Sequence, residues 1–242
     1  MEFIQARWFT RVTAKRRIDF IVLHSMEAPE KGTTAESVAR YFAAGTVKAS
    51  AHFNVDADSI VQSVRENDIA YHAPPNTHSI GVEHAGYARQ TRAQWLDAYG
   101  LAMLRRSAGL VRALAAKHDV PLVFLSPAQL RAGKRGITTH ANVSKAWGLT
   151  SHTDPGKGFP IDHYMALLYP PRPEPPQPQE DDDMVMQRYT DGGPRGEFVI
   201  APDGAVHLKN ATHRDLLIAE GRASKSLKRI TKQQLDELLE KE

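Results

Sequence analysis

The stretch Ser-His-Thr-Asp-Pro-Gly at residues 151–156 combines an imidazole and a carboxylate, two groups that bind metals or transfer protons. A residue before proline avoids the helical region, so we expect an extended backbone at Asp154. Side chains two residues apart in an extended chain point to the same side. His152 and Asp154 are therefore predicted to face one site.

Two further histidines occupy positions where an extended segment ends. His24 closes the apolar, β-branched run at 18–24, and strand ends are where α/β proteins place ligand-binding groups. His140 follows a short extended piece that begins with glycine. Two histidines and one carboxylate, with an open fourth position for water, form a catalytic zinc set. A single histidine among 11 is more often a packing or surface group, so the prediction depends on all three.

The elements that must position these residues alternate between strand and helix patterns. This alternation predicts an α/β domain with a mixed central β-sheet flanked by helices. We expect capping boxes at Thr33/Glu36 and Thr91/Gln94, and helix ends at Gly45 and Gly133. The predicted elements are strands at 18–24, 78–86 and 120–126, a hairpin at 51–64 that turns at 56–59, and helices at 33–45, 91–118 and 126–133.

A proline-rich, then acidic stretch at 171–183 predicts a semi-rigid linker, because such a composition cannot bury a core. It separates a domain at 1–170 from a tail at 184–242. In the tail we expect a hairpin at 197–209 and two short helices that start at Thr212 and Thr231, which together form a small α+β module. Its role is open between cell-wall attachment and dimerisation or solubility.

Composition limits the possible classes of protein. The chain has 242 residues, of which 41% are hydrophobic and 24% charged, as in water-soluble globular proteins. It has no cysteine, so a metal would be held by histidine and carboxylate. We find no signal peptide and no apolar run of membrane-spanning length, and therefore expect synthesis in a cytoplasm and no membrane insertion.

The charge is concentrated in the first domain, where residues 1–171 carry 20 Lys and Arg against 14 Asp and Glu. A basic domain suits an anionic polymer, which includes nucleic acid, cell wall and membrane surface. No nucleic-acid-binding motif accompanies the charge, so DNA binding is the weakest of these hypotheses.

Four separated blocks resemble one enzyme family. They read "IDFIVLHSMEAP", "SAHFNVDADSIVQSVRENDIAYHA", "SIGVEHAG" and "ITTHANVSKAWGLTSHTDPGKGFP", and they occur in the order found in zinc-dependent N-acetylmuramoyl-L-alanine amidases of type 2. That superfamily includes phage endolysin amidases and peptidoglycan recognition proteins. The resemblance runs from about residue 5 to residue 168. It implies bacterial peptidoglycan as the partner and Zn²⁺ as the cofactor, held by His24, His140 and Asp154.

The resemblance also implies roles for three further residues. Glu83 matches the family's general base. Relatives that use a tyrosine instead carry it at the position of Ala51, which excludes that variant here. His152 occupies a position where many relatives have a lysine, and it is expected to stabilise the oxyanion. Because histidine loses its charge at a lower pH than lysine does, we expect the alkaline limb of the pH–rate profile to begin at a lower pH than it would with lysine. His72 matches a histidine that lines the substrate groove.

The first functional hypothesis is an endolysin-like hydrolase that cleaves the amide between N-acetylmuramic acid and L-alanine. It would remain in the host cytoplasm until lysis and then act at the cell wall. One alternative is a cytoplasmic amidase that recycles soluble muropeptides. Another is a non-catalytic peptidoglycan-recognition module, although such relatives generally lose a metal ligand and none is lost here. The oligomeric state stays open.

Overall fold

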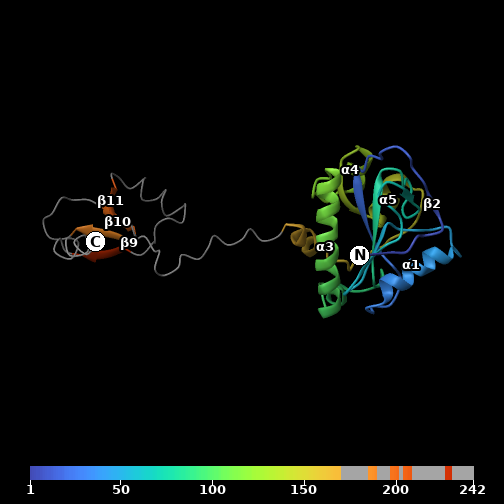
Figure 1. Ribbon diagram of the computed structural model, residues 1–242, viewed down its shortest axis with the longest axis horizontal. Coiled ribbons are helices and arrows are strands. Elements are labelled where there is room, and N and C mark those ends of the chain that lie inside the picture. The colour runs from blue at the N-terminus through green and yellow to red at the C-terminus, as the bar shows by residue number, and fades with distance from the viewer. Residues whose placement is uncertain (170–184, 190–196, 202–203, 209–226, 231–242) are drawn as a thin grey trace. The chain divides into compact units, whose positions relative to one another are not determined.

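The computed structural model describes residues 1–169, 185–189, 197–201, 204–208 and 227–230. The chain divides into two compact units, Met1–Pro170 and Pro171–Glu242 (Figure 1). Each is described by itself.

A six-stranded mixed sheet forms the centre of the first unit, which confirms the predicted fold class. Its order is β1-β5-β4-β7-β3-β8. All neighbouring pairs are parallel except β4 and β5, the predicted hairpin. A separate pair joins β2 and β6. The strands are β1 Glu2–Phe3, β2 Phe9–Thr10, β3 Phe20–Ser25, β4 Phe53–Val55, β5 Ile60–Gln62, β6 Ile69–Ala70, β7 Ser79–His84 and β8 Gly136–Thr139.

Six helices accompany this sheet. They are α1 Thr34–Ala44, α2 Arg92–Trp95, α3 Ala98–His118, α4 Pro127–Arg131, α5 His140–Trp147 and α6 Ile161–Leu168. The long α3 runs along the sheet, and α4 and α5 lie together in another part of the unit (Figure 1).

The two faces of the sheet carry different residues because side chains alternate along a strand. Ile21 and Leu23 of β3 join the main core with α3 and α6. Phe20 and Val22 of the same strand pack instead with residues of α4 and α5. His24 continues this second series, so the strand that builds the core also delivers His24 to the face opposite α3.

Three predictions about elements are wrong. Helix 91–118 is broken into α2 and α3, because Asp97 starts a new helix by accepting a hydrogen bond from Gly100 N at 2.8 Å. The strand at 120–126 is reduced to one bridge, Phe124 with Ile137. Thr33 forms no capping box. Its place is taken by Asp56, whose carboxylate accepts from Ala35 N at 3.0 Å.

The second unit contains a four-stranded sheet in the order β11-β10-β9-β12. Its strands are β9 Val185–Tyr189, β10 Glu197–Ala201, β11 Gly204–Leu208 and β12 Leu227–Ile230. The antiparallel pair β10 and β11 confirms the predicted hairpin. The expected helices from Thr212 and Thr231 and the linker at 171–183 lie outside the described residues. Within the described part of the chain, no helix is both long and apolar enough to cross a membrane.

Candidate metal and active site

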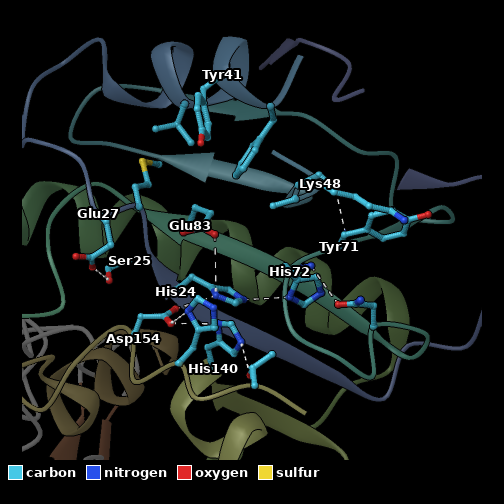
Figure 2. A pocket seen from close by; sticks show the side chains of 18 of the residues that line it. His24, Ser25, Glu27, Tyr41, Lys48, Tyr71, His72, Glu83, His140 and Asp154 are labelled. Carbon is cyan, nitrogen blue, oxygen red and sulfur yellow. Dashed lines mark hydrogen bonds and ion pairs between the residues drawn. The ribbon is translucent and has the colours of Figure 1, made fainter. Parts of the chain in front are cut away.

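His24, His140 and Asp154 converge in the first unit (Figure 2). The carboxylate lies between the two imidazoles: Oδ2 is 2.9 Å from His24 Nδ1, and Oδ1 is 3.1 Å from His140 Nδ1. One donor atom from each residue lies within 4.8 Å of the others, and all three residues are buried. The structure therefore brings together the three residues that the sequence predicts as metal ligands.

Two of these residues lie on regular elements, and the third lies on a loop that is hydrogen-bonded to one of them. His24 lies on β3, and His140 is the first residue of α5, directly after β8. The carbonyl of Asp154 accepts a hydrogen bond from Ala141 N at 2.9 Å, which ties the acid's loop to the start of α5. Gly156 has φ +94, and a Cβ there would lie 1.8 Å from Ala88 O, so only glycine fits this turn.

The hydrogen bonds around His24 determine which ring nitrogen carries its proton. Ser79 donates to Asn76 O at 3.2 Å, so its oxygen accepts from His72 Nε2 at 3.0 Å. His72 Nδ1 then accepts from His24 Nε2 at 3.0 Å. This leaves a lone pair on His24 Nδ1, the atom that faces Asp154.

Two lone-pair-bearing atoms 2.9 Å apart need a positive charge between them, either a proton or a metal ion. His140 Nδ1 meets the same carboxylate, and its Nε2 lies 3.3 Å from Thr150 Oγ1. A ligating histidine typically has its second nitrogen hydrogen-bonded in this manner. The donor set therefore fits a divalent cation.

The protonation preferences agree with this fit. Burial lowers the pKa of His24, against the opposing effect of its hydrogen bond to Asp154. Burial alone would raise the pKa of Asp154, but hydrogen bonds with His140 and His24 outweigh it and lower the pKa. A neutral imidazole and an ionised carboxylate are the forms that bind metals.

Glu83, the predicted general base, lies on β7 directly beside His24 in the parallel register. Its Oε1 is 4.0 Å from His24 Nδ1, and its Oε2 is buried without a hydrogen-bond partner among the residues that the structure describes. Burial, with the charges of Asp154 and Glu27, raises the pKa of this carboxyl well above its usual range. A carboxyl group that holds a proton this readily can accept one from water and release it again.

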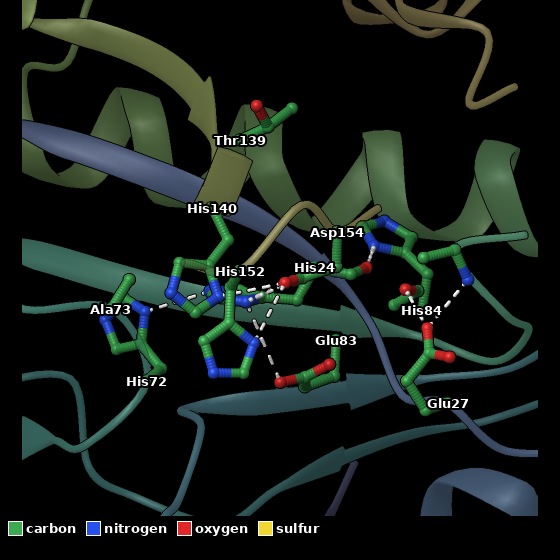
Figure 3. A network of polar contacts seen from close by, with 12 residues as sticks. His24, Glu27, His72, Ala73, Glu83, His84, Thr139, His140, His152 and Asp154 are labelled. Atoms are coloured by element: carbon green, nitrogen blue, oxygen red, sulfur yellow. Dashed lines mark hydrogen bonds and ion pairs between the residues drawn. The ribbon is translucent and has the colours of Figure 1, made fainter. Parts of the chain in front are cut away.

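His152 and His72 each contact one of the two donor histidines (Figure 3). The His152 ring stacks on His140 with centroids 4.5 Å apart and its Nδ1 is 3.6 Å from Asp154 Oδ1, but the side chain is 64% exposed. His72 is buried, and burial lowers its pKa well below the usual range. Both residues line the groove described next, so all six predicted site residues meet there.

A groove of about 440 Å³ extends away from the donors toward α1 (Figure 2). Sequence reasoning missed several of its lining residues. Lys48 lies just before the second resemblance block, Tyr71 lies inside that block but was given no role, and Tyr41 of α1 is 48% exposed. Val38, Tyr41 and Phe42 all line the groove from one face of α1, as their helical spacing allows.

A second network beneath the site was also missed. His84 Nδ1 donates to the carbonyl of His24 at 2.8 Å, so its Nε2 accepts from Ser107 Oγ at 2.7 Å. Ser107 in turn accepts from the Tyr164 hydroxyl at 2.8 Å. Burial lowers the pKa of His84 to about 4, which keeps it neutral as this chain of hydrogen bonds requires.

The family model for N-acetylmuramoyl-L-alanine amidase matches residues 14–157. The chain belongs to this amidase family. The match covers more than half of the chain and includes all six site residues. It confirms the predicted resemblance and identifies the chain as an amidase, an enzyme that hydrolyses an amide bond. Peptidoglycan is the class of substrate that this membership supports.

Solved structures resemble the amidase unit at low identity. The Staphylococcus aureus hydrolase AmiA, solved in complex with its ligand, shares 20% identity over 69% of this chain and 80% of that chain, with a TM-score of 0.53. A mutant endolysin from Bacillus subtilis shares 24% over 70% and 100%, with a TM-score of 0.47. The N-acetylmuramoyl-L-alanine amidase LysC from Clostridium intestinale shares 18% over 69% and 95%, also at 0.47. The AmiA likeness shows the fold. A search of curated proteins finds no match.

Proposed function

We propose that this amidase cleaves the bond between N-acetylmuramic acid and L-alanine in bacterial peptidoglycan, with zinc held by His24, His140 and Asp154. The observation that supports zinc is the meeting of two imidazole nitrogens at one buried carboxylate, with a second carboxyl group beside them. Histidine and carboxylate ligands suit zinc, and a three-residue set leaves a position open for chemistry.

Bound zinc in such a set supplies Lewis-acid chemistry, which polarises a carbonyl and lowers the pKa of water to about 7. Glu83 takes the proton of the attacking water and delivers it to the nitrogen of L-alanine as the carbon–nitrogen bond breaks. Its raised pKa suits both halves of that transfer.

His152 donates a hydrogen bond to the carbonyl oxygen as negative charge develops there, a role supported by its exposed ring beside Asp154. His72 holds His24 through the hydrogen bond between their ring nitrogens. Both nitrogens of His72 already have partners, so the substrate contact that we expect for this residue comes from the edge of its ring.

One experiment tests the metal and the reaction together. Purified wild type and His140→Ala are analysed for zinc, and wall digests are mapped by mass. We expect wild type to carry zinc and to release L-alanine amino ends, and His140→Ala to lose both. His78→Ala, which changes a half-exposed histidine outside the groove, is the matched control. Zinc-loaded wild type that releases no such ends would support the non-catalytic recognition module instead.

We further propose an endolysin-like role, in which the enzyme acts on the polymeric wall after release from the host cytoplasm. The proline-rich linker and the additional C-terminal module favour a polymer over soluble fragments, because tethering raises the effective concentration of substrate. Cleavage rates on intact sacculi and on purified muropeptides distinguish the two. Faster turnover of the fragments would favour the recycling amidase.

Cell-wall attachment by residues 184–242, one of the two roles left open for this module, has its own test. A variant that lacks residues 172–242 should remain in solution when cell walls are pelleted, whereas the full chain should sediment with them. Equal pelleting of the two proteins would leave dimerisation or solubility as the module's role.

A further inference from the structure

The groove of the amidase unit separates charge along its length. Its three carboxylates, from Glu27, Glu83 and Asp154, all lie at the end that holds the candidate metal ligands. Lys48 lies toward the other end, near Tyr71 (Figure 2). It is the only lysine or arginine among the lining residues of this groove.

The groove wall around Lys48 is held by several hydrogen bonds. Ser50 Oγ donates to the carbonyl of Trp8 at 2.5 Å and accepts from Tyr71 N at 3.0 Å. Ser50 N also donates to Tyr71 O at 3.1 Å. The ammonium of Lys48 lies 6.0 Å from the centre of the Trp8 ring, close enough for a cation–π contact.

The ammonium group of Lys48 is available to a ligand. Within residues 1–169, no carboxylate lies within the 4.0 Å that defines an ion pair with it. Other basic residues of the unit, such as Arg17, Lys117 and Arg135, do form such pairs. A groove with acids at the reactive end and one uncompensated ammonium at the other favours a ligand that carries its negative charge away from the bond to be cleaved.

Peptidoglycan stem peptides carry charge in that arrangement. The bond to be cleaved precedes L-alanine, and the next residue, a D-glutamyl residue, bears an α-carboxyl group that is either free or amidated. We propose that Lys48 binds this free carboxylate, so that the peptide runs from the metal ligands toward Lys48. The enzyme then prefers stems with the free acid over stems with the amide. This inference rests on the proposed function.

Two synthetic muramyl peptides that differ only in carboxylate or carboxamide at the second residue test the proposal. We expect wild type to cleave the acid roughly two- to fivefold more efficiently, the range of a solvent-exposed ion pair. Lys48→Met, which keeps the length of the side chain without its charge, should cleave both equally, whereas Lys48→Arg should retain the preference. Lys134→Met, an exposed lysine outside the groove, is the matched control.

Salt provides a readout that a purely structural role of Lys48 would not affect. Between about 0.01 M and about 1 M salt the Debye length falls from about 30 Å to about 3 Å, so the preference of the wild type should vanish. A lysine that only supports the fold would lower cleavage of both peptides alike. A preference that survives in Lys48→Met, or a wild type that cleaves both peptides equally, overturns the role of Lys48 and leaves the proposed function intact. If neither peptide is cleaved, the proposed function fails and this inference with it.

Discussion

Gly81 is a position where one methyl group should disturb the site through a single neighbouring side chain, His72. It lies on β7, on the face that carries Glu83, and the His72 ring packs directly over it. A Cβ added there would lie 2.6 Å from His72 Cγ and 2.7 Å from Nδ1, whereas ordinary contacts begin at 3.4 Å. In Gly81→Ala the His72 ring must therefore move by roughly 0.8 Å. Its Nδ1, which is 3.0 Å from His24 Nε2, moves with it, so the hydrogen bond to His24 is disturbed.

The expected cost follows from this displacement. Overpacking of a dense interior costs about 1–3 kcal/mol. For a unit of this size each kcal/mol lowers the melting temperature by about 2–4 °C, so we expect a decrease of roughly 2–12 °C. If the shift of His72 is transmitted to His24, kcat/KM should fall by up to about 100-fold, the effect of a 1 Å misplacement.

The assays are thermal unfolding, zinc content and amidase kinetics. Gly109→Ala is the matched control, because a Cβ on this glycine of α3 meets nothing within 4 Å. It should stabilise the helix, by up to about 1 kcal/mol. Removal of the ring in Gly81→Ala/His72→Ala should relieve the clash, so the double variant should lose less stability than the sum of the two single variants. Additive losses, or a Gly81→Ala variant identical to wild type, would refute this reasoning.

Three further perturbations test separate parts of the structure. Glu83→Gln should lower kcat by about 10²–10⁴-fold, the usual contribution of a general base, while zinc content by metal analysis stays unchanged; a loss of zinc instead would place Glu83 among the ligands. Burial lowers the pKa of His52 to about 3, so the unfolded chain binds its proton first and stability should fall as pH drops from about 6.5 toward 3, by up to about 1.4 kcal/mol per pH unit. Urea unfolding of chelator-treated wild type and His52→Gln at pH 7 and pH 5 isolates this contribution, and an equal change of stability with pH in the two proteins would contradict it. Asp97→Ala removes the cap of α3 and should cost about 1 kcal/mol in the same urea assay, with no change in zinc content.

Local signals predicted an element correctly where its stabilising contacts were also local. The box of Thr91 and Gln94 starts α2 as expected, because both partners lie within one turn. The same kind of pattern failed at Thr33, because the hydrogen bond from Ala35 N at the start of α1 is accepted by Asp56, which lies 21 residues after Ala35. No local pattern contains that information.

The site shows the same division. Strand ends and the turn at Pro155 indicated which residues would face a site, and family resemblance completed the set of ligands. Lys48 could not be predicted, because the segment that carries it is held beside Tyr71 by the long-range hydrogen bonds of Ser50. His84 lies one residue after Glu83 and faces the other way, so the sequence places it near the site, whereas its partners Ser107 and Tyr164 emerge only from packing.

Register connects the core to the chemistry. In the parallel pair of β3 and β7, Leu23 lies beside Val82 and His24 beside Glu83. The first pair is buried in the main core, and the second faces the groove. A slip of one residue would exchange the two faces, burying an imidazole among apolar side chains and exposing a leucine to the groove. The apolar contacts that stabilise the sheet thus also favour the register in which Glu83 lies beside His24, so the site needs no separate means of aligning these two side chains.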